Sequence, residues 1–194
     1  KDYIPKAVRL ARSMNNGRKK FVWTAGSYLI RYALDHSSPE DTRNLQKAIR
    51  NGDVRYHALP LTTHSELMNE RLFRYGISIA GKLDAEFGLH THAAKMTDVP
   101  GHTIGMVPLL YEKGIKFLHI GVNPATPLPP VPNLFKWKHK DSQIIVMYQG
   151  DYGEVAEFDD FVICFAHTND NCGPQSTDEI INIYKDIQKN ENAW

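Results

Sequence analysis

Segments with strand-like and helix-like patterns alternate along the chain, and this alternation constrains the fold more than any other feature. Short β-prone apolar runs occur at residues 21–24, 54–59, 91–96, 116–120, 143–148 and 161–165. Helical spacing of apolar residues occurs at residues 6–14, 39–51, 70–87, 103–113 and 176–189. Because parallel strands need long crossover connections, the alternation predicts an α/β domain with a mostly parallel sheet and outer helices. The pattern leaves open whether this sheet is a barrel or an open sheet.

Local signals define several of the helix ends. Ser38-Pro39-Glu40-Asp41 supplies an N-cap, a proline at the first helical position and acidic residues in the first turn. The helix that starts there is expected to end near Gly52, and the helix over residues 70–87 at Gly88. Pro108 lies inside the predicted helix 103–113, where it is expected to cause a kink.

The size and charge of the chain limit its organisation and its partners. With 194 residues, 42% of them hydrophobic, we expect a single α/β domain over residues 1–194. The chain starts within an amphipathic pattern and without Met, so we expect it to be a truncated part of a larger catalytic domain. Lys and Arg number 23 against 22 Asp and Glu, which argues against a nucleic-acid or anionic-membrane partner. No apolar run is long enough to span a bilayer, no targeting segment is evident, and the compartment and the oligomeric state stay open.

Polar, reactive side chains gather just after the predicted strands. In parallel α/β folds ligands bind beyond the carboxyl ends of the strands. His64 follows the second strand, Asp98 and His102 the third, and His167 and Asp170 the last. These residues form a predicted site, although each alone also suits a solvated loop.

Asp98 lies in the turn Thr97-Asp98-Val99-Pro100-Gly101-His102-Thr103 and is the main catalytic candidate. A carboxylate there suits a metal ligand, a nucleophile or a general base. The alternative is an Asx-turn or an N-cap for the helix that follows. Asp170 is the second carboxylate candidate, and its alternative is a turn residue before the last helix.

The histidines and Trp23 give weaker signals. No histidine pair has the spacing of a zincin helix or a zinc finger. His57 and His119 fall within predicted strands, where satisfied core histidines are expected. Trp23 ends the first predicted strand, where it suits either a sugar-stacking platform or a core position.

Two segments resemble the N-terminal catalytic domain of glycoside hydrolase family 38, the α-mannosidases. The first is the Asp98 turn, followed by Met106-Val107-Pro108-Leu109-Leu110 and Gly114-Ile115-Lys116-Phe117, where the family has Asp-Pro-Phe-Gly-His-Ser, an apolar helix ending in Gly, and a strand. The second is Asp170-Asn171-Cys172-Gly173-Pro174-Gln175-Ser176, which is similar to the Asp-Gly-Gly-Gly-Gly-Pro-Thr run of bacterial members.

The resemblance implies a fold, a reaction and a cofactor. The fold would be a seven-stranded β/α barrel, incomplete in this chain. The reaction would be the retaining hydrolysis of an α-glycosidic bond in a carbohydrate substrate, with Asp98 as the nucleophile and a zinc ligand and Asp170 as the acid/base. Trp23, His64, His102 and His167 would bind the substrate.

This sequence also departs from the family. The His-x-Asp motif and a later His that supply the other zinc ligands have no clear counterpart, so one of four ligands is kept. We therefore expect zinc in the complete domain, weak zinc binding by this chain and no activity of this chain alone. Val99-Pro100 and Asn171-Cys172 replace family residues, so the substrate need not be a mannoside.

Two other functions stay open. A metal-dependent polysaccharide deacetylase uses a related barrel with one Asp and two His ligands, but its His-x-x-x-His spacing is absent. A non-catalytic carbohydrate-binding barrel would keep the fold without the chemistry.

Overall fold

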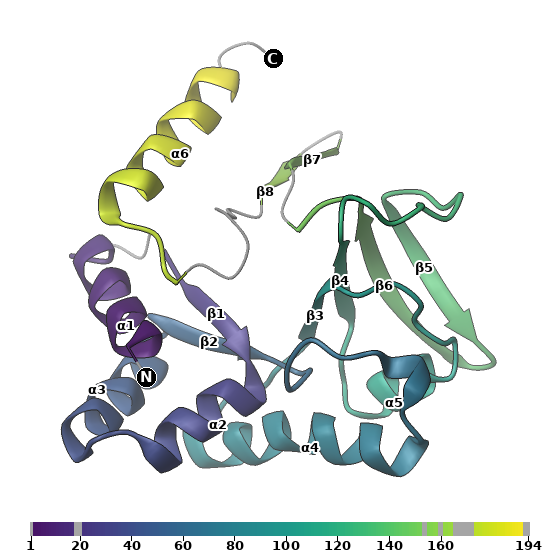
Figure 1. Cartoon of the computed structure of the whole chain (residues 1–194), viewed down its shortest axis with the longest axis horizontal. Helices are drawn as coiled ribbons and strands as arrows, with labels where there is room; N and C mark the ends of the chain where they lie inside the picture. Colours follow the sequence, from purple (N-terminus) through teal and green to yellow (C-terminus); the bar gives the residue numbers. More distant parts are fainter. Residues whose placement is uncertain (1, 18–20, 153–154, 159–160, 165–172, 192–194) are drawn as a thin grey trace. The chain divides into compact units, whose positions relative to one another are not determined.

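The computed structural model of the chain describes residues 2–17, 21–152, 155–158, 161–164 and 173–191 (Figure 1). Contacts between residues divide the chain into two compact units. The first unit comprises Lys1–Trp23, His36–Arg55 and Ala166–Trp194, and the second comprises Thr24–Asp35 and Tyr56–Phe165. Each unit is described by itself.

The first unit is helical. Helix α1 (Tyr3–Met14) packs against α3 (Pro39–Asn51) and also contacts α6 (Thr177–Glu191). Both α1 and α3 bury one apolar stripe, as the helical spacing predicts. The buried side chains of these two helices are Ala7, Val8, Leu10, Ala11, Leu45, Ala48 and Ile49.

The predicted caps of α3 are confirmed. The Ser38 side chain accepts a hydrogen bond from the Asp41 backbone N–H at 3.1 Å, and Pro39 is the first helical residue. At the other end Gly52 adopts φ +76°, a left-handed conformation that glycine takes without steric cost. Local sequence chemistry therefore defines both ends of this helix.

The second unit contains a four-stranded sheet in the order β3-β4-β6-β5 (Figure 1). Strands β3 (Ala93–Asp98), β4 (Phe117–Val122) and β6 (Ser142–Gln149) are parallel, and β5 (Leu134–His139) runs antiparallel to β6. Asp98 is opposite Val122, and Gly121 is opposite Gln149. The carboxyl ends of the three parallel strands therefore meet at one edge of the sheet.

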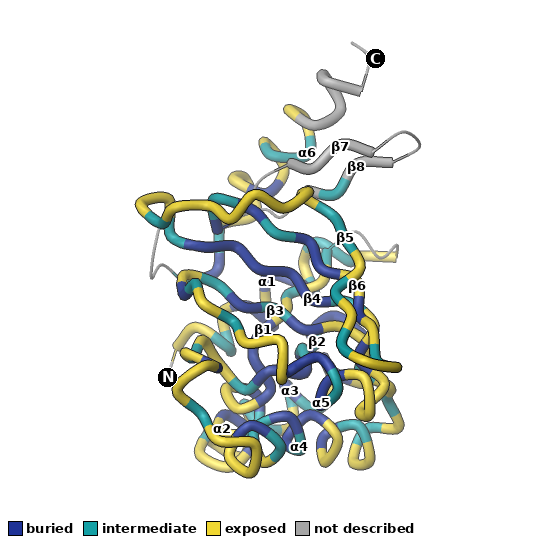
Figure 2. Tube along the Cα trace, turned by 90° about the vertical axis from the view of Figure 1, so that its right-hand side faces the viewer, coloured by how far each residue is buried: buried dark blue, intermediate teal, exposed yellow. Residues whose placement is uncertain are grey.

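One face of this sheet forms the main core, together with α4 (Glu70–Phe87) and α5 (Met106–Glu112). Alternate residues of the strands contribute to it because successive strand side chains point to opposite faces. β4 is almost wholly buried, whereas buried and exposed residues alternate over part of β6 (Figure 2). The core side chains include Phe73, Ile77, Ala94, Met96, Met106, Val107, Leu110, Leu118, Ile120, Val122, Ile144 and Val146.

The sequence predicts helix α4 well and other elements less well. The predicted range 70–87 matches α4, which has Asn69 as N-cap and Gly88 in a left-handed C-cap. Helix α5 begins at Met106 rather than at residue 103, so Pro108 falls in the first turn, where its missing N–H costs little. Pro108 therefore does not have to kink α5, contrary to the expectation from the sequence.

The pattern misses four elements. These are α2 (Ser27–His36), the short 3₁₀ helix η1 (Ser65–Leu67), β5 and β7 (Val155–Phe158). α2 exposes Tyr28, Leu29 and Tyr32, so its apolar residues lie all around the helix and hide its period. β7 pairs antiparallel with β8 (Phe161–Cys164).

The α/β class is confirmed, and β3, β4 and β6 form the predicted parallel arrangement. β1 (Trp23–Gly26) and β2 (Val54–His57) pair in a separate two-stranded sheet. The strands of the described residues thus form three sheets rather than a closed ring, and the seven-stranded barrel stays a prediction. Across the same residues, each helix is too short or too polar to cross a membrane.

Truncation of a core side chain tests this architecture. Leu110 of α5 is fully buried in the main core. We expect Leu110→Ala to lower the free energy of unfolding by about 2–5 kcal/mol, because it removes buried methyl groups and leaves a cavity. Leu67→Ala, at a side chain that is 80% exposed, should change it by less than about 0.5 kcal/mol in the same urea titration. Equal losses in the two variants would contradict the assigned core.

Candidate functional site

Asp98 is the last residue of β3 and has an unusual backbone conformation. Its φ of +78° lies in the left-handed region, which Asp tolerates better than most residues. The sequence places Asp98 in a turn after the strand, and the structure shows it within the strand end. Gly105, not Asp98, occupies the N-cap of α5, so the capping role considered for Asp98 is wrong.

The Asp98 carboxylate is held by residues from the two neighbouring strand ends. The Tyr152 hydroxyl donates to Asp98 Oδ1 at 2.7 Å, and Asn123 Nδ2 donates to the same oxygen at 3.2 Å. Asn123 Nδ2 also lies 2.8 Å from the Tyr152 hydroxyl oxygen. Asn123 directly follows β4, and Tyr152 lies three residues after β6. Within the described residues, Oδ2 of Asp98 accepts no hydrogen bond.

The electrostatics favour an ionised Asp98. The Tyr152 hydroxyl and then the Asn123 amide lower the pKa of this carboxyl group, because both hydrogen bonds stabilise the charged form. Burial raises this pKa by less than the two hydrogen bonds lower it, and His64 lowers it by the smallest amount. Asp98 is therefore an exposed carboxylate with one oxygen available for a nucleophilic, basic or metal-binding role.

His102 lies on the turn that follows Asp98. Its Nδ1 is 2.8 Å from Ser65 Oγ, and its Nε2 is buried without a hydrogen-bond partner among the described residues. Burial is the largest influence and lowers the pKa of the imidazole, whereas the Val99 backbone and Glu66 raise it. His102 is thus a neutral imidazole close to the Asp98 strand end.

Ser65 and Glu66 support this turn. A Ser–His contact can indicate a hydrolase nucleophile, but Ser65 is only 2% exposed, and its role is therefore to orient His102. Gly101 has φ +80°, and a Cβ on it would overlap the Glu66 carboxylate. The glycine in the Asp98 segment is therefore required for its left-handed conformation, and its lack of a Cβ also leaves room for the Glu66 carboxylate.

A pocket lined mainly by apolar and aromatic residues adjoins the turn. It has a volume of about 470 Å³, with Pro100, Gly101 and His102 on its wall. Strands β5 and β6 contribute three aromatic rings, and the Pro-rich loop 123–133 supplies the other apolar groups. The three rings are Phe135, Trp137 and Tyr148. Aromatic faces of this kind suit the apolar side of a sugar ring.

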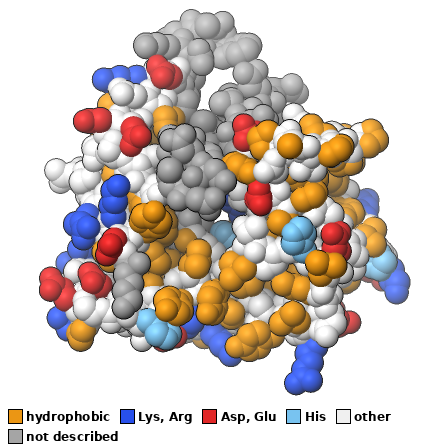
Figure 3. All heavy atoms as spheres, in the orientation of Figure 1, with side chains coloured by type: hydrophobic (Ala, Val, Ile, Leu, Met, Phe, Trp, Pro, Cys, Tyr) orange, Lys and Arg blue, Asp and Glu red, His pale blue; other side chains and the backbone are white. Residues whose placement is uncertain are grey.

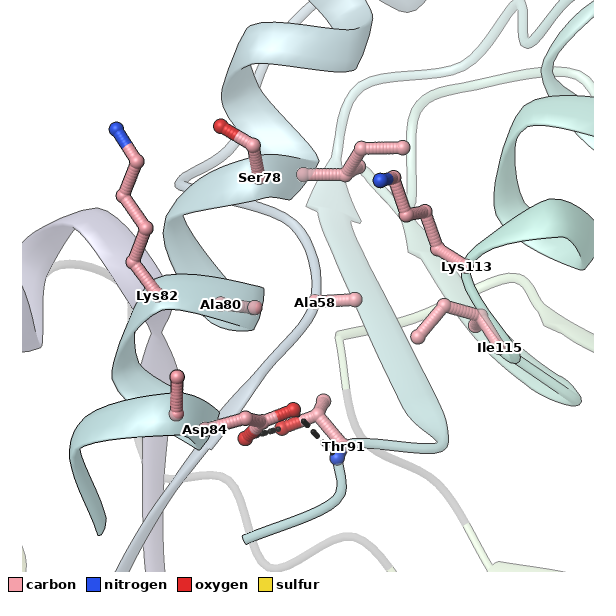
Figure 4. Close-up of a pocket in the computed structure, with 11 residues that line it drawn as sticks. Ala58, Ser78, Ala80, Lys82, Asp84, Thr91, Lys113 and Ile115 are labelled. Carbon is pink, nitrogen blue, oxygen red and sulfur yellow. Dashed lines mark hydrogen bonds between the residues drawn. The ribbon is translucent and has the colours of Figure 1, made fainter. Parts of the chain in front are cut away.

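Two other hollows in the second unit suit catalysis less well. One, of about 390 Å³, lies at the amino ends of β3 and β4, where both Asp84 oxygens bind Thr91 (Figure 4). Because Asp84 also accepts a hydrogen bond from Tyr56, this carboxylate has a structural role. The other, of about 210 Å³, has mostly apolar walls and lies by the exposed hydrophobic side chains of α2 and α4 (Figure 3).

A polar cluster occupies the face of the sheet opposite the main core. Lys95 Nζ lies 2.9 Å from His119 Nδ1, and His119 Nε2 lies 2.7 Å from Gln149 Oε1. Burial lowers the pKa of Lys95 to about 8, and burial with the Lys95 charge lowers that of His119 to about 3. His119 is thus a satisfied interior histidine, as its strand position predicts.

His57 faces the same Lys95 charge from the end of β2. Burial, and then Lys95, lowers the pKa of its imidazole to about 4. Its Nδ1 is buried with no hydrogen-bond partner in the described part of the chain. The expectation for His57 is therefore correct for its interior position but not for its hydrogen bonds, because Nδ1 has no partner among the described residues.

The predicted site residues have different outcomes. The structure places Asp98 and His102 on the same turn, and His64 has an electrostatic effect on both. Trp23 is half-buried and begins β1 in the first unit rather than ending a strand. His167 and Asp170 lie outside the described residues.

Sequence reasoning did not identify several residues of this site. Tyr152, Trp137 and Lys95 are absent from the predicted set, and His119 was given no functional role. The one sequence signal that could have identified a missed residue was the charge of Lys95 within a predicted apolar strand.

The expected zinc site is not formed by the described residues alone. No group of three or more His, Cys, Asp or Glu among them is arranged to hold a metal.

Comparison with known proteins gives a structural likeness only. No protein-family model matches the chain, and no curated protein matches it in sequence. The structure is similar to that of a 4-alpha-glucanotransferase from Thermococcus litoralis, with a TM-score of 0.54 and 10% sequence identity. The match covers 76% of this chain and 24% of that chain. This chain shares its fold with part of a glucanotransferase.

Removal of the Tyr152 hydroxyl tests the electrostatics of the site. We expect Tyr152→Phe to raise the pKa of Asp98 toward its ordinary value, because the largest stabilising interaction of the carboxylate is lost. Carboxyl ¹³C chemical shifts followed against pH measure this change. Tyr111→Phe, an exposed tyrosine on α5, is the control and should leave the pKa of Asp98 in place.

The buried histidines predict acid sensitivity. His57 binds its proton at about pH 4 when folded and at about pH 6.5 when unfolded, so the free energy of unfolding should fall as pH drops below about 6.5. The loss due to His57 alone should reach up to about 3 kcal/mol near pH 4. His57→Leu should flatten this dependence, measured by urea titration at several pH values. The exposed His36→Leu is the control, and identical slopes in both variants would rule out the effect.

Proposed function

We propose that this chain contributes a catalytic carboxylate, Asp98, to a carbohydrate-active site of the glycosidase type. The observation that carries the proposal is the geometry of Asp98 at the carboxyl end of a parallel strand. Tyr152 and Asn123 hold one of its oxygens and keep it ionised, and the other oxygen accepts nothing from the described residues. The fold likeness to a 4-alpha-glucanotransferase supports the same class of chemistry.

The proposed reaction is retaining hydrolysis of an α-glycosidic bond. Asp98 Oδ2 attacks the anomeric carbon, the glycosidic bond breaks, and the leaving oxygen takes a proton from a carboxylic acid, for which we propose Asp170. The carboxylate of Asp170 then removes a proton from water, which displaces Asp98 and restores the starting configuration. Such a pair of carboxyl groups lies about 5–5.5 Å apart in retaining enzymes, and this distance is a requirement of the proposal.

Zinc is part of the proposal for the complete catalytic domain. Asp98 is exposed and would supply one ligand, and the exposed His64 interacts with it electrostatically. Zinc sites in proteins need three or four such groups, so the remaining ligands would come from outside the described residues. The ion would supply Lewis acidity toward the sugar hydroxyls.

The proposed substrate is a glycan bound in the pocket that Pro100, Gly101 and His102 of the Asp98 turn help to line. Trp137 and Tyr148 line this pocket and offer ring faces for stacking. His102 and His64 would contact sugar hydroxyls, and Trp23 and His167 stay proposed as further contacts. An α-mannoside is the first sugar to test because of the resemblance of the Asp98 segment to family 38.

Substitution of Asp98 tests the proposal. In the complete catalytic domain proposed above, Asp98→Asn should lower kcat/KM on aryl α-glycosides about 1,000-fold or more, because an amide does not act as a nucleophile. Initial rates are measured with zinc added, on α-mannosides first and then on other α-glycosides. Asp141→Asn, in the turn between β5 and β6, is the matched control and should retain the wild-type rate.

Two results would contradict the proposal, one for the role of Asp98 and one for the proposed function. Equal rates for Asp98→Asn and wild type would remove Asp98 from the mechanism. A wild-type protein without activity on any of these substrates would overturn the proposed function itself.

A further inference from the structure

A continuous set of hydrogen bonds leads from the polar face of the sheet to Asp98. Lys95 Nζ donates to His119 Nδ1 at 2.9 Å and to the Tyr152 backbone carbonyl at 3.2 Å. The hydroxyl of the same Tyr152 donates to Asp98 Oδ1 at 2.7 Å. A single residue, Tyr152, therefore separates the Lys95 ammonium from the proposed catalytic carboxylate.

The hydrogen bonds of His119 determine which of its two ring nitrogens carries the proton. Gln149 Oε1 accepts from His119 Nε2 at 2.7 Å, and this leaves the lone pair of Nδ1 for Lys95. His119 stays neutral at ordinary pH because its pKa is lowered to about 3, so it acts as an acceptor for the ammonium. His119 is 1% exposed and Gln149 is 3% exposed, which keeps water away from these bonds.

A glycine allows Tyr152 to come close to the sheet. A Cβ on Gly121 of β4 would lie 2.6 Å from the Asp151 carbonyl oxygen and 3.2 Å from Tyr152 Cα. A side chain at this position would therefore push the segment 151–152 away from β4. Because Gly121 has no side chain, the Tyr152 carbonyl can reach Lys95 while the Tyr152 hydroxyl reaches Asp98.

We propose that Lys95, oriented by His119 and Gln149, is a positioning residue that fixes the backbone of Tyr152 and thereby holds the Tyr152 hydroxyl on Asp98. The effect of Lys95 on the reaction rests on the proposed function, whereas its effect on the position of Tyr152 does not. None of the three residues of the cluster forms a hydrogen bond with Asp98 in the described residues. Their effect on the reaction passes through Tyr152.

The structural part is tested by the NMR signal of Tyr152 in the 194-residue chain. Tyrosine labelled with ¹³C at Cζ reports the hydrogen bond of the hydroxyl, and Tyr152→Phe identifies the signal by its loss. We expect Lys95→Met to move this signal, because Met does not donate to the Tyr152 carbonyl. Lys136→Met, at an exposed lysine of β5 in the same sheet, is the control and should leave the signal in place.

Two results overturn the structural part. An unchanged Tyr152 signal in folded Lys95→Met would show that the lysine does not hold Tyr152, as would an equal shift in the Lys136→Met control. If Lys95→Met does not fold, Lys95→Gln decides by the same signal, because its side chain is too short to reach both acceptors.

The catalytic part is tested in the complete catalytic domain of the proposed function. Lys95→Met should lower kcat about 10- to 100-fold, since misplacement of a catalytic group by about 1 Å has an effect of this size. KM should stay within about twofold, because no substrate contact is removed. An unchanged kcat together with a shifted Tyr152 signal would overturn the catalytic role. If wild type is inactive, the proposed function fails, and the NMR result still decides whether Lys95 positions Tyr152.

Discussion

The burial of one face of the β3–β4–β6 sheet is the constraint on which the candidate site depends. Alternate strand residues enter a single core with α4 and α5, and a shift of register by one residue would expose them. Because the register is fixed in this way, the carboxyl ends of the three strands are aligned. The alignment places Asp98, Asn123 and Tyr152 in contact although they come from three separate segments.

The opposite face of the sheet carries a different requirement. Lys95, His119 and Gln149 alternate with the core residues and are largely removed from water. Buried polar groups are costly unless they are hydrogen-bonded, and here each one bonds to the next. Lys95 completes the set through the Tyr152 carbonyl, so the same bonds that satisfy this face also reach the candidate site.

The proposed chemistry depends on how the two oxygens of Asp98 are used. Hydrogen bonds to one oxygen keep the carboxylate ionised and fix its orientation, and the second oxygen is left for the reaction. The left-handed backbone of Asp98 is consistent with a functional position, because strained conformations cluster at such sites. The aromatic pocket that adjoins the Asp98 turn suits a carbohydrate substrate.

The sequence by itself determined the α/β class, most helices and strands, the caps of α3 and the glycine C-cap of α4, and it made Asp98 the main candidate. These features depend on apolar periodicity and on contacts within a few residues, which the sequence displays directly. Tertiary structure alone decided that Tyr152 holds Asp98, because the two residues are 54 positions apart. It also placed Trp137 rather than Trp23 on the wall of the pocket that adjoins the Asp98 turn, since hairpin pairing and not local pattern brings β5 to this pocket. Lys95 gained its role in the same way, through a partner on β4 that only the parallel register brings opposite it.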